Sequence, residues 1–402
     1  MVNETRIDAA SLTGIRLATL PPLSLYVHVP WCVRKCPYCD FNSHEWREPG
    51  EAAAAIPEEA YAQALIADLE SALPSIWGRR IETIFFGGGT PSLLSGAALD
   101  RILSAIRARV SLAPGAEITL EANPGTVEAA RFGQFHDAGI TRLSVGVQSF
   151  NDAHLRRLGR IHGADDARRA VEAALRAIGN VNLDIMYALP EQTLEQARED
   201  IEMAIATGVP HLSAYHLTLE PNTLFARHPP PLPDEDLASD IQDLVDQTLS
   251  VAGFEHYETS AHARPGARCG HNLNYWQFGD YLGIGAGAHS KISFPDRIVR
   301  EARVRLPRDY MQRAIEGRAL QSSQAVARAD LAGEYMMNAL RLADGFEMAR
   351  FTERTGLAAT SIGAVLDQAA RRGLITHDVV RVRPTELGRR FLNDLLAMFL
   401  AA

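Results

Sequence analysis

Three cysteines lie within eight residues near the start of the chain. Cys32, Cys36 and Cys39 follow a C-x3-C-x2-C spacing, whereas the fourth cysteine, Cys269, is far away in the sequence. Three thiolates on one loop can bind three irons of a [4Fe–4S] cluster, which leaves the fourth iron without a protein ligand. The spacing therefore predicts a cluster held by these three cysteines, with one iron open to an exogenous ligand.

Zinc is the competing metal for such a loop. A structural zinc site takes four protein ligands, usually Cys and His. No histidine stands at conventional spacing from the three cysteines, and His28 and His44 are the candidates for a fourth ligand. The iron–sulfur interpretation needs no fourth side chain and is favoured.

The composition describes an enzyme-sized globular chain. Its 402 residues are 47% apolar and carry 40 basic and 49 acidic side chains, for a net charge of −9. These values exclude disordered, collagen-like and coiled-coil proteins. A net acidic chain without a basic stripe argues against a nucleic-acid partner. The sequence shows no apolar leader and no apolar run near the roughly 20 residues of a membrane span, so we expect a cytoplasmic protein whose membrane contact is at most peripheral.

Strand-like runs alternate with Ala- and Leu-rich segments of helical period. The predicted strands cover 23–29, 81–86, 117–121, 142–147, 181–187 and 212–217. The predicted helices cover 58–73, 96–110, 126–137, 165–178 and 193–207. Repeated βα units join parallel strands through right-handed crossovers. Six units predict an α/β fold built on a partial (β/α)6 barrel, open on one side, and a doubly wound sheet is the alternative with the same pattern.

The pattern changes after this repeat. The run His228-Pro-Pro-Pro-Leu-Pro233 can only be extended, and a helix is predicted over 235–252. From about 328 the pattern is helical with two short strand-like pieces, 374–376 and 379–382, which predicts a small, mainly helical, winged-helix-like domain, followed by a last helix near 385–400. The chain is predicted to have four parts. They are an N-terminal extension (1–22), the partial barrel (23–225), a lid region that contains a motif around His271 (226–325) and the C-terminal domain (326–402).

The cysteine loop and the residues after the second predicted strand together resemble the radical S-adenosylmethionine (SAM) superfamily. The run Phe86-Gly-Gly-Gly-Thr-Pro-Ser92 matches the Gly-rich stretch that meets the methionyl end of SAM in that superfamily. Glycines there let the backbone approach a ligand, because no Cβ intervenes. The resemblance implies that the open iron binds the amino and carboxylate groups of SAM.

Further motifs resemble the coproporphyrinogen dehydrogenase-like branch of the superfamily. They cover 117–124, 144–150, 155–160 and 182–190. In that branch the residues at the matching positions contact SAM, namely Tyr26, Tyr38, Gly88, Gly89, Thr90, Glu121, Gln148, Arg160 and Asp184. Carboxylates at strand ends can accept from the SAM ammonium or ribose hydroxyls, and an arginine can pair with its carboxylate.

One departure and one motif narrow the function that the resemblance implies. Oxygen-independent coproporphyrinogen III dehydrogenases carry a fourth cysteine two positions after the third, where this chain has Phe41. The segment Gly270-His271-Asn272-Leu273-Asn274-Tyr275-Trp276 is similar to the H-N-x-x-Y motif of the radical SAM heme chaperones. This implies a protein that binds heme through His271, Asn272 and Tyr275 and passes it to an acceptor, such as a membrane-bound respiratory cytochrome.

The residues by themselves leave the role of His271 open. It can be an axial ligand of heme iron, or it can cap a helix together with Asn272 while Tyr275 packs in the lid. Cys269 is either a second candidate axial ligand or a small buried hydrophobe. The weaker alternatives for heme ligation are His256, His262 and His289.

Two function classes therefore compete. One is a heme chaperone that carries a [4Fe–4S] cluster and SAM. The other is an enzyme that cleaves SAM to a 5′-deoxyadenosyl radical and decarboxylates coproporphyrinogen III. The first is favoured because Phe41 replaces the fourth cysteine. Radical modification of another substrate is the third possibility.

Overall fold

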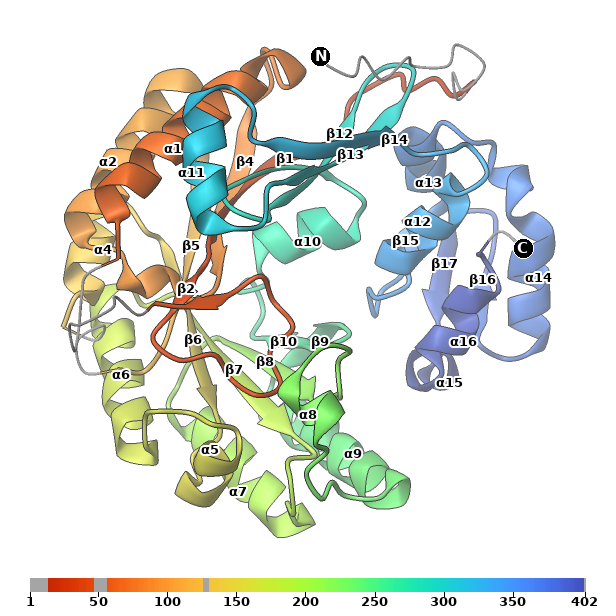
Figure 1. Ribbon diagram of the computed structural model, residues 1–402. Coiled ribbons are helices and arrows are strands. Elements are labelled where there is room, and N and C mark those ends of the chain that lie inside the picture. Colours follow the sequence, from red (N-terminus) through yellow and green to blue (C-terminus); the bar gives the residue numbers. More distant parts are fainter. Residues whose placement is uncertain (1–13, 47–55, 126–129, 401–402) are drawn as a thin grey trace.

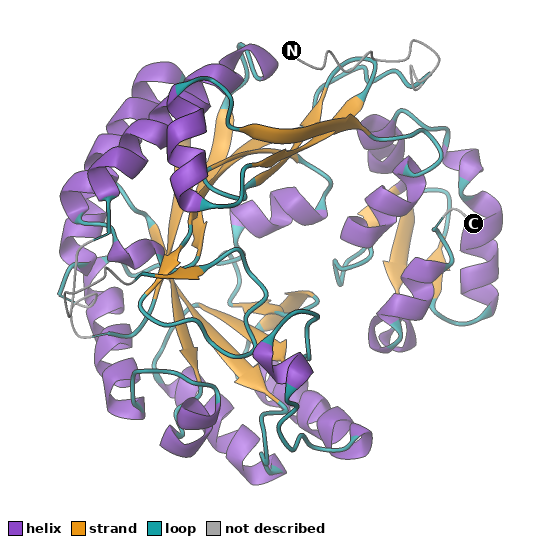
Figure 2. Ribbon diagram, in the orientation of Figure 1, coloured by secondary structure: helices purple, strands orange, loops and turns teal. Residues whose placement is uncertain are grey.

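The computed structural model describes residues 14–46, 56–125 and 130–400 and contains a large curved sheet (Figure 1). Its twelve strands run in the order β14-β13-β12-β11-β1-β4-β5-β6-β7-β8-β10-β9. The six predicted strands are parallel neighbours in chain order, namely β1 (Leu23–Val29), β4 (Ile81–Gly88), β5 (Leu112–Ala122), β6 (Arg142–Gln148), β7 (Val181–Tyr187) and β8 (His211–His216). Helices cover the convex side of this layer, and the opposite side is open (Figure 2). The partial barrel is thereby confirmed over the doubly wound sheet, which would carry helices on both faces.

The helices of the barrel follow the predicted segments. They are α1 (Glu58–Ala72), α2 (Gly96–Arg109), α4 (Phe132–Ala138), α5 (Asp152–Arg157), α6 (Ala164–Ala177) and α7 (Leu194–Ala206). The helix expected over 126–137 begins at Phe132, and residues 126–129 lie outside the described residues. The extended proline run lies between α8 (Leu224–Arg227) and α9 (Glu235–Val251). Short 3-10 turns cover Leu73–Ser75, Pro91–Leu93 and Ala359–Ser361.

The sheet extends beyond the predicted barrel at both ends. Four strands lie on the far side of β1, namely β11 (Asp280–Ile284), β12 (His289–Ser293), β13 (Ile298–Arg303) and β14 (Leu320–Ala325). β11 is parallel to β1, and the others are antiparallel. At the other end, β9 (Glu255–Glu258) and β10 (Ala261–Ala263) add an antiparallel hairpin to β8. The sequence analysis missed these strands because they are short and carry charged residues at buried positions.

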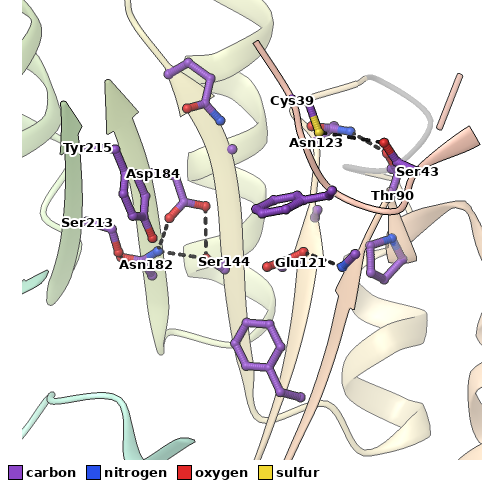
Figure 3. Close-up of a pocket in the computed structure, with 18 of the residues that line it drawn as sticks. Cys39, Ser43, Thr90, Glu121, Asn123, Ser144, Asn182, Asp184, Ser213 and Tyr215 are labelled. Carbon is purple, nitrogen blue, oxygen red and sulfur yellow. Dashed lines mark hydrogen bonds between the residues drawn. The ribbon is translucent and has the colours of Figure 1, made fainter. Parts of the chain in front are cut away.

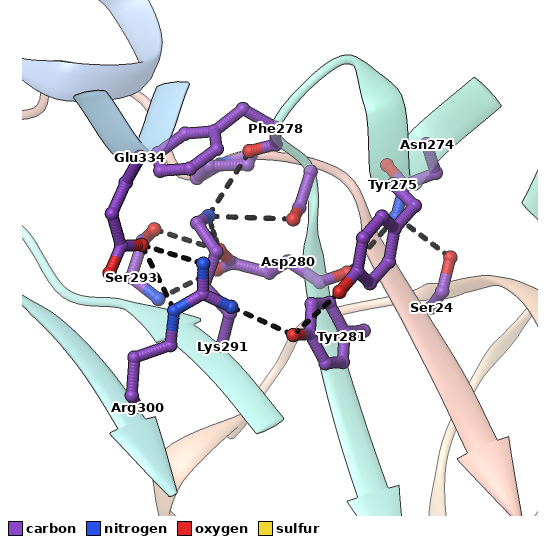
Figure 4. Close-up of polar contacts among 12 residues, drawn as sticks. Ser24, Asn274, Tyr275, Phe278, Asp280, Tyr281, Lys291, Ser293, Arg300 and Glu334 are labelled. Atoms are coloured by element: carbon purple, nitrogen blue, oxygen red, sulfur yellow. Dashed lines mark hydrogen bonds and ion pairs between the residues drawn. The ribbon is translucent and has the colours of Figure 1, made fainter. Parts of the chain in front are cut away.

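A buried ion pair holds the first two of the added strands together (Figure 4). Lys291 of β12 places Nζ 2.8 Å from Oδ1 of Asp280 on β11, and both side chains are at most 2% exposed. Arg79 reaches the other carboxylate oxygen at 2.8 Å, and Ser293 donates to the same carboxylate. Burial alone would raise the pKa of Asp280, but the two cations outweigh it and hold the pKa low.

A second buried pair ties β13 to the barrel helices. Nε of Arg303 lies 3.2 Å from Oδ1 of Asp68 on α1, and the hydroxyl of Tyr310 donates to the other oxygen at 2.9 Å. Tyr310 belongs to α11 (Pro307–Ile315), which packs on α1. The added strands are therefore an integral part of the barrel.

The C-terminal part has its own core and lies across the open side of the barrel (Figure 1). It contains α12 (Leu331–Ala339), β15 (Phe346–Glu347), α13 (Met348–Thr355), α14 (Gly363–Arg371), β16 (Ile375–His377), β17 (Arg381–Pro384), α15 (Glu386–Arg390) and α16 (Leu392–Ala397). Helices with a three-stranded antiparallel sheet confirm the expected winged-helix-like fold. The single last helix expected near 385–400 is wrong, because Phe391 leaves the helical region with φ −108° and ψ 44°. Among the described residues, no helix is both long and apolar enough to cross a membrane.

The Asp280 site provides a test of stability. Asp280→Ala is expected to lower the free energy of unfolding by about 3–5 kcal/mol, because Lys291 and Arg79 would keep buried charges without their partner. Urea denaturation followed by circular dichroism measures this loss. The matched control, Asp344→Ala, removes an exposed partner of Arg268 and should cost less than about 1 kcal/mol. Equal losses in the two variants would contradict the assigned role.

Candidate functional site

The cysteine loop leaves the carboxyl end of β1 and is closed at its base by a short strand pair. β2 (Trp31–Cys32) pairs with β3 (His44–Glu45). Lys35 donates from Nζ to the carbonyl oxygens of Phe41 and Ser43, which fixes the turn between the cysteines. As a result all three thiols line one cavity of about 550 Å³ at the carboxyl ends of the parallel strands, here called the cysteine cavity.

The thiols have few polar neighbours. Sγ of Cys39 lies 3.7 Å from Oγ of Ser43, and Nη1 of Arg160 lies 3.6 Å from Sγ of Cys36. Burial raises the pKa of both Cys32 and Cys39, so the thiolate form requires a cation such as iron. The donor set of three sulfurs on one cavity wall therefore fits an iron–sulfur cluster with one open corner.

The two histidines considered for zinc are placed elsewhere. Neither His28 nor His44 lines the cysteine cavity. Both ring nitrogens of His28 already have partners, since Nδ1 lies 3.0 Å from the hydroxyl of Tyr26 and Nε2 lies 2.9 Å from the carbonyl oxygen of Asn42. Burial lowers the pKa of His28 to about 4, so its ring is neutral. Neither of these two histidines is therefore placed as a fourth metal ligand beside the cysteines.

Two glycines at the carboxyl end of β4, here called the glycine wall, line the cavity beside the cysteine loop. Gly88 has φ +116°, and a Cβ there would lie 2.5 Å from the ring of His28. A Cβ on Gly89 would lie 2.5 Å from the carbonyl oxygen of Trp31. Both positions require glycine, so the backbone of β4 can approach the cysteine loop closely.

Glu121, at the end of β5, contacts this glycine wall. Its Oε2 accepts from the backbone N–H of Gly88 at 3.1 Å. Burial raises the pKa of Glu121 to about 8, and the nearby Asp184 adds to the rise. The carboxyl group is thus held mainly protonated near pH 7, in a place where a cationic ligand would favour its charged form.

Asp184 lies at the centre of a polar network across three strands (Figure 3). Asn182 donates to Oδ1 of Asp184 at 2.8 Å, and Ser144 donates to Oδ2 at 3.1 Å. Ser213 donates to the amide oxygen of Asn182 at 3.1 Å. Burial raises the pKa of Asp184 despite these donors. Sequence analysis did not single out Asn182, Ser144 and Ser213. The signal for Asn182 is its spacing, because a residue two positions before Asp184 in a strand lies on the same face of the sheet.

Arg160 links the cysteine loop to the middle of the sheet. Its Nη2 donates to Oδ1 of Asn123 at 2.5 Å and to the carbonyl oxygen of Gly146 at 2.8 Å. The amide of Asn123 in turn donates to Oγ1 of Thr90 at 3.0 Å. Nε of Arg160 is buried and has no partner among the described residues, so this guanidinium retains a donor for a ligand.

The histidine motif forms a short helix at the floor of the cavity. In α10 (Gly270–Trp276) the N-cap is Cys269, so the alternative in which His271 and Asn272 cap the helix is wrong. The backbone N–H of His271 donates to Oε1 of Glu117 at 3.1 Å. Tyr275 lies one turn along the same helix, and the motif's three polar residues, His271, Asn272 and Tyr275, all line the cysteine cavity.

His271 presents one free ring nitrogen. Its Nδ1 lies 2.9 Å from Oγ1 of Thr83, and the Thr83 hydroxyl donates onward to Ser24. Nδ1 must therefore carry the hydrogen, which leaves the lone pair on Nε2. Within the described part of the chain Nε2 has no hydrogen-bond partner. Burial, with the nearby Arg142 as a smaller cause, lowers the pKa of His271 to about 3, so the ring is in its neutral, ligating form.

The weaker candidates for metal or heme ligation lie outside the cysteine cavity. Cys269 is fully buried, its thiol donates to Glu117, and burial raises its pKa to about 11. His256 and His262 form a cluster with Asp246 of α9, with Nε2 of His262 lying 3.1 Å from a carboxylate oxygen. The two imidazoles stack with centroids 4.2 Å apart and an angle of 20°. The ligand atoms of the three residues lie within 4.8 Å of one another, so this cluster is a separate group of potential metal ligands away from the cysteines.

All of the predicted site residues thus line one cavity, although they come from seven separate segments of the chain. They are Tyr26, Cys32, Cys36, Tyr38, Cys39, Gly88, Gly89, Thr90, Glu121, Gln148, Arg160, Asp184, His271, Asn272 and Tyr275. The sequence analysis missed Arg142, which lines the same cavity, is 2% exposed and has a partnerless Nε. An arginine at the start of a strand carries no pattern that would distinguish a buried cavity residue from an exposed one.

Comparison with known proteins agrees with this geometry. Residues 26–204 match the radical SAM superfamily, and residues 326–391 match the HemN C-terminal domain. The heme chaperone HemW of Escherichia coli is 50% identical over 96% of this chain and 100% of its own length. HemW of Mycobacterium tuberculosis is 35% identical over 90% of this chain and 93% of its own.

A solved structure shares the fold over nearly the whole chain. Coproporphyrinogen III oxidase (HemN) from Escherichia coli, a radical SAM enzyme, superposes with a TM-score of 0.80 at 24% identity and covers 95% of this chain and 91% of its own. This likeness shows the architecture, whereas the heme chaperones share much more of the sequence. By its identity with those proteins along almost its entire length, the chain belongs to the HemW family within the radical SAM superfamily.

Proposed function

We propose that this protein is a heme chaperone, which binds heme and transfers it to an acceptor protein, and that it carries a [4Fe–4S] cluster and SAM. The observation that carries the proposal is that His271, neutral and with Nε2 free, lines the same cavity as the three cysteines. The relatives that match the full chain are named heme chaperones. We expect the acceptor to be a respiratory cytochrome, and three free cysteines spaced as metal ligands favour the cytoplasm as compartment.

Cys32, Cys36 and Cys39 would hold the cluster, and the fourth iron would take the amino and carboxylate groups of SAM. When bound and reduced, such a cluster supplies the electron that cleaves SAM in radical SAM enzymes. The chain's own contribution to SAM binding is a set of groups around the cavity, with Glu121 for the amino group and Asp184 for the ribose hydroxyls. Arg160 supplies a partnerless Nε for the SAM carboxylate.

Replacing any one of the three cluster cysteines with Ala is expected to abolish the brown chromophore formed on anaerobic reconstitution. Each thiolate binds one iron, so its loss opens a second corner of the cluster. Iron analysis and the visible spectrum measure the effect. Cys269→Ala is the matched control and should keep four irons per chain, because its thiol lies outside the cavity. A triple variant that retained four irons would contradict the assignment.

Glu121→Gln is expected to weaken SAM binding by about tenfold or more, because a hydrogen bond from the SAM amino group to a charged carboxylate is replaced by one to a neutral amide. Calorimetry on the reconstituted protein measures the affinity. Glu82→Gln, an exposed change on the same strand as Gly88, is the control and should bind SAM like the wild type. Unchanged affinity in Glu121→Gln would count against this role.

The same variant gives a second readout through pH. A carboxyl whose folded pKa is about 8 contributes stability that is fully present below its unfolded pKa of roughly 4.3 and is lost as pH rises through 8. Ligand-free wild type should therefore lose thermal stability between pH 5 and pH 8, and Glu121→Gln should lose less. Identical pH profiles of Tm would show that Glu121 does not titrate in this range.

His271→Ala is expected to change the visible spectrum of bound heme, because an axial imidazole is lost. Thr83→Val should shift the spectrum less, since it only releases Nδ1, and Tyr275→Phe should act most mildly. Heme titration with optical spectra, with and without SAM, measures all three. Absence of heme uptake by the wild type at micromolar concentration, or efficient conversion of coproporphyrinogen III, would favour the dehydrogenase instead.

A further inference from the structure

A second cavity, of about 720 Å³, lies beside the cysteine cavity on the side of strands β11 to β14 and is here called the β11–β14 cavity. The two cavities share a wall, and the residues that line both are Tyr26, Phe41, Gly88, Glu121, His271 and Tyr275. His271 therefore faces both spaces.

Of the residues proposed to bind SAM, Tyr26, Gly88 and Glu121 lie in the shared wall, and the others line the cysteine cavity alone. None of the three cysteines lines it, nor do Arg160 and Asp184. Its volume lies within the roughly 300–1,000 Å³ of ordinary ligand sites. A second ligand can therefore be bound there while the cysteine cavity holds the cluster and SAM.

The lining suits a large flat aromatic ligand that contains a metal ion. Phe41, which is 59% exposed, and Tyr281 contribute aromatic side chains to the lining. His289 also lines the cavity, and within the described part of the chain its imidazole makes no hydrogen bond. Burial lowers the pKa of His289, so the ring is neutral. Apolar rings and neutral imidazoles are the groups that hold heme in proteins.

One cation at this cavity is unpaired. Arg303 is paired with Asp68 and Glu301, and Arg300 nearby is paired with Glu334 and donates to Tyr281 (Figure 4). Arg305, which is exposed and lines the cavity, has no carboxylate partner among the described residues.

In the part of the chain that the structure describes, the other polar side chains of the lining do not pair with Arg305. The carboxylate of Asp40 lines the same cavity but makes no ion pair with Arg305 within the described ranges. Gln321 and Ser322 of β14 add neutral polar groups to the lining. The cavity thus joins an apolar, imidazole-bearing part to one guanidinium that is free to bind a carboxylate.

We propose that the β11–β14 cavity is the heme site, with the porphyrin against Phe41 and Tyr281 and one propionate paired with Arg305. This inference rests on the proposed heme chaperone function and adds where heme lies relative to SAM. Heme and SAM occupy adjoining cavities and bind together, and His271 stands in the wall between them.

The test compares hemin with its dimethyl ester, which keeps the ring and iron but lacks the propionate charges. Both are titrated into full-length protein with a reconstituted cluster, as wild type and as Arg305→Ala. Arg305→Ala should weaken hemin binding by about tenfold and leave binding of the ester unchanged, because only hemin offers the carboxylate. Arg308→Ala, an exposed arginine outside the cavity, is the matched control and should bind both ligands like the wild type.

The outcomes separate this inference from the function on which it rests. If wild type binds no hemin, the proposed function fails. If wild type binds hemin but Arg305→Ala binds it equally well, or loses hemin and ester to the same extent, the heme site is elsewhere while the function stands. Saturating SAM should leave hemin affinity within about twofold, and competition between the two would place heme in the cysteine cavity and overturn the proposal.

Discussion

The pairing of β1 with β4 on one side and β11 on the other is the constraint on which the site depends. Tyr26 is opposite Phe85 in β4 and opposite Gly283 in β11, so three parallel strands end at the same edge. The cysteine loop leaves β1, the glycine wall leaves β4, and the histidine helix α10 leads into β11. The cysteine loop reaches the cavity from the carboxyl ends of these strands, whereas α10 precedes β11 and lies nearer their amino ends, where His271 contacts Thr83 near the start of β4. Segments some 240 residues apart in the chain, around Cys32 and around His271, thereby line one cavity.

This arrangement requires polar groups to be buried at the centre of the sheet. Glu121 and Asp184 are partly buried and His271 is buried, and this burial shifts the pKa of each side chain in the direction that favours its neutral form. Hydrogen bonds from strand neighbours hold Asp184 and His271 in fixed orientations. A site of this kind is less stable than an apolar core of the same size, and the ion pairs of Asp280 and Asp68 fasten its outer strands.

Phe41 is a position at which this chain differs from the dehydrogenases that it resembles. It stands where the dehydrogenases of the branch carry a fourth cysteine, and it lines both the cysteine cavity and the β11–β14 cavity. An aromatic ring at this point supplies an apolar face between the two spaces. The architecture shared with HemN is thus compatible with a different use of the space beside the cluster.

The sequence by itself determined the cysteine loop, the six parallel strands, the C-terminal domain and many of the residues around the cavity. These features are local, since cysteine spacing, glycine runs and hydrophobic period are properties of short segments. Only the tertiary structure decided that β11 to β14 extend the sheet. Charged residues such as Asp280 and Lys291 are typical of exposed segments, and their burial is possible here because the two side chains form an ion pair. The free Nε2 of His271, the unpaired Arg305 and the cavity between them depend on contacts between distant segments, which no local pattern records.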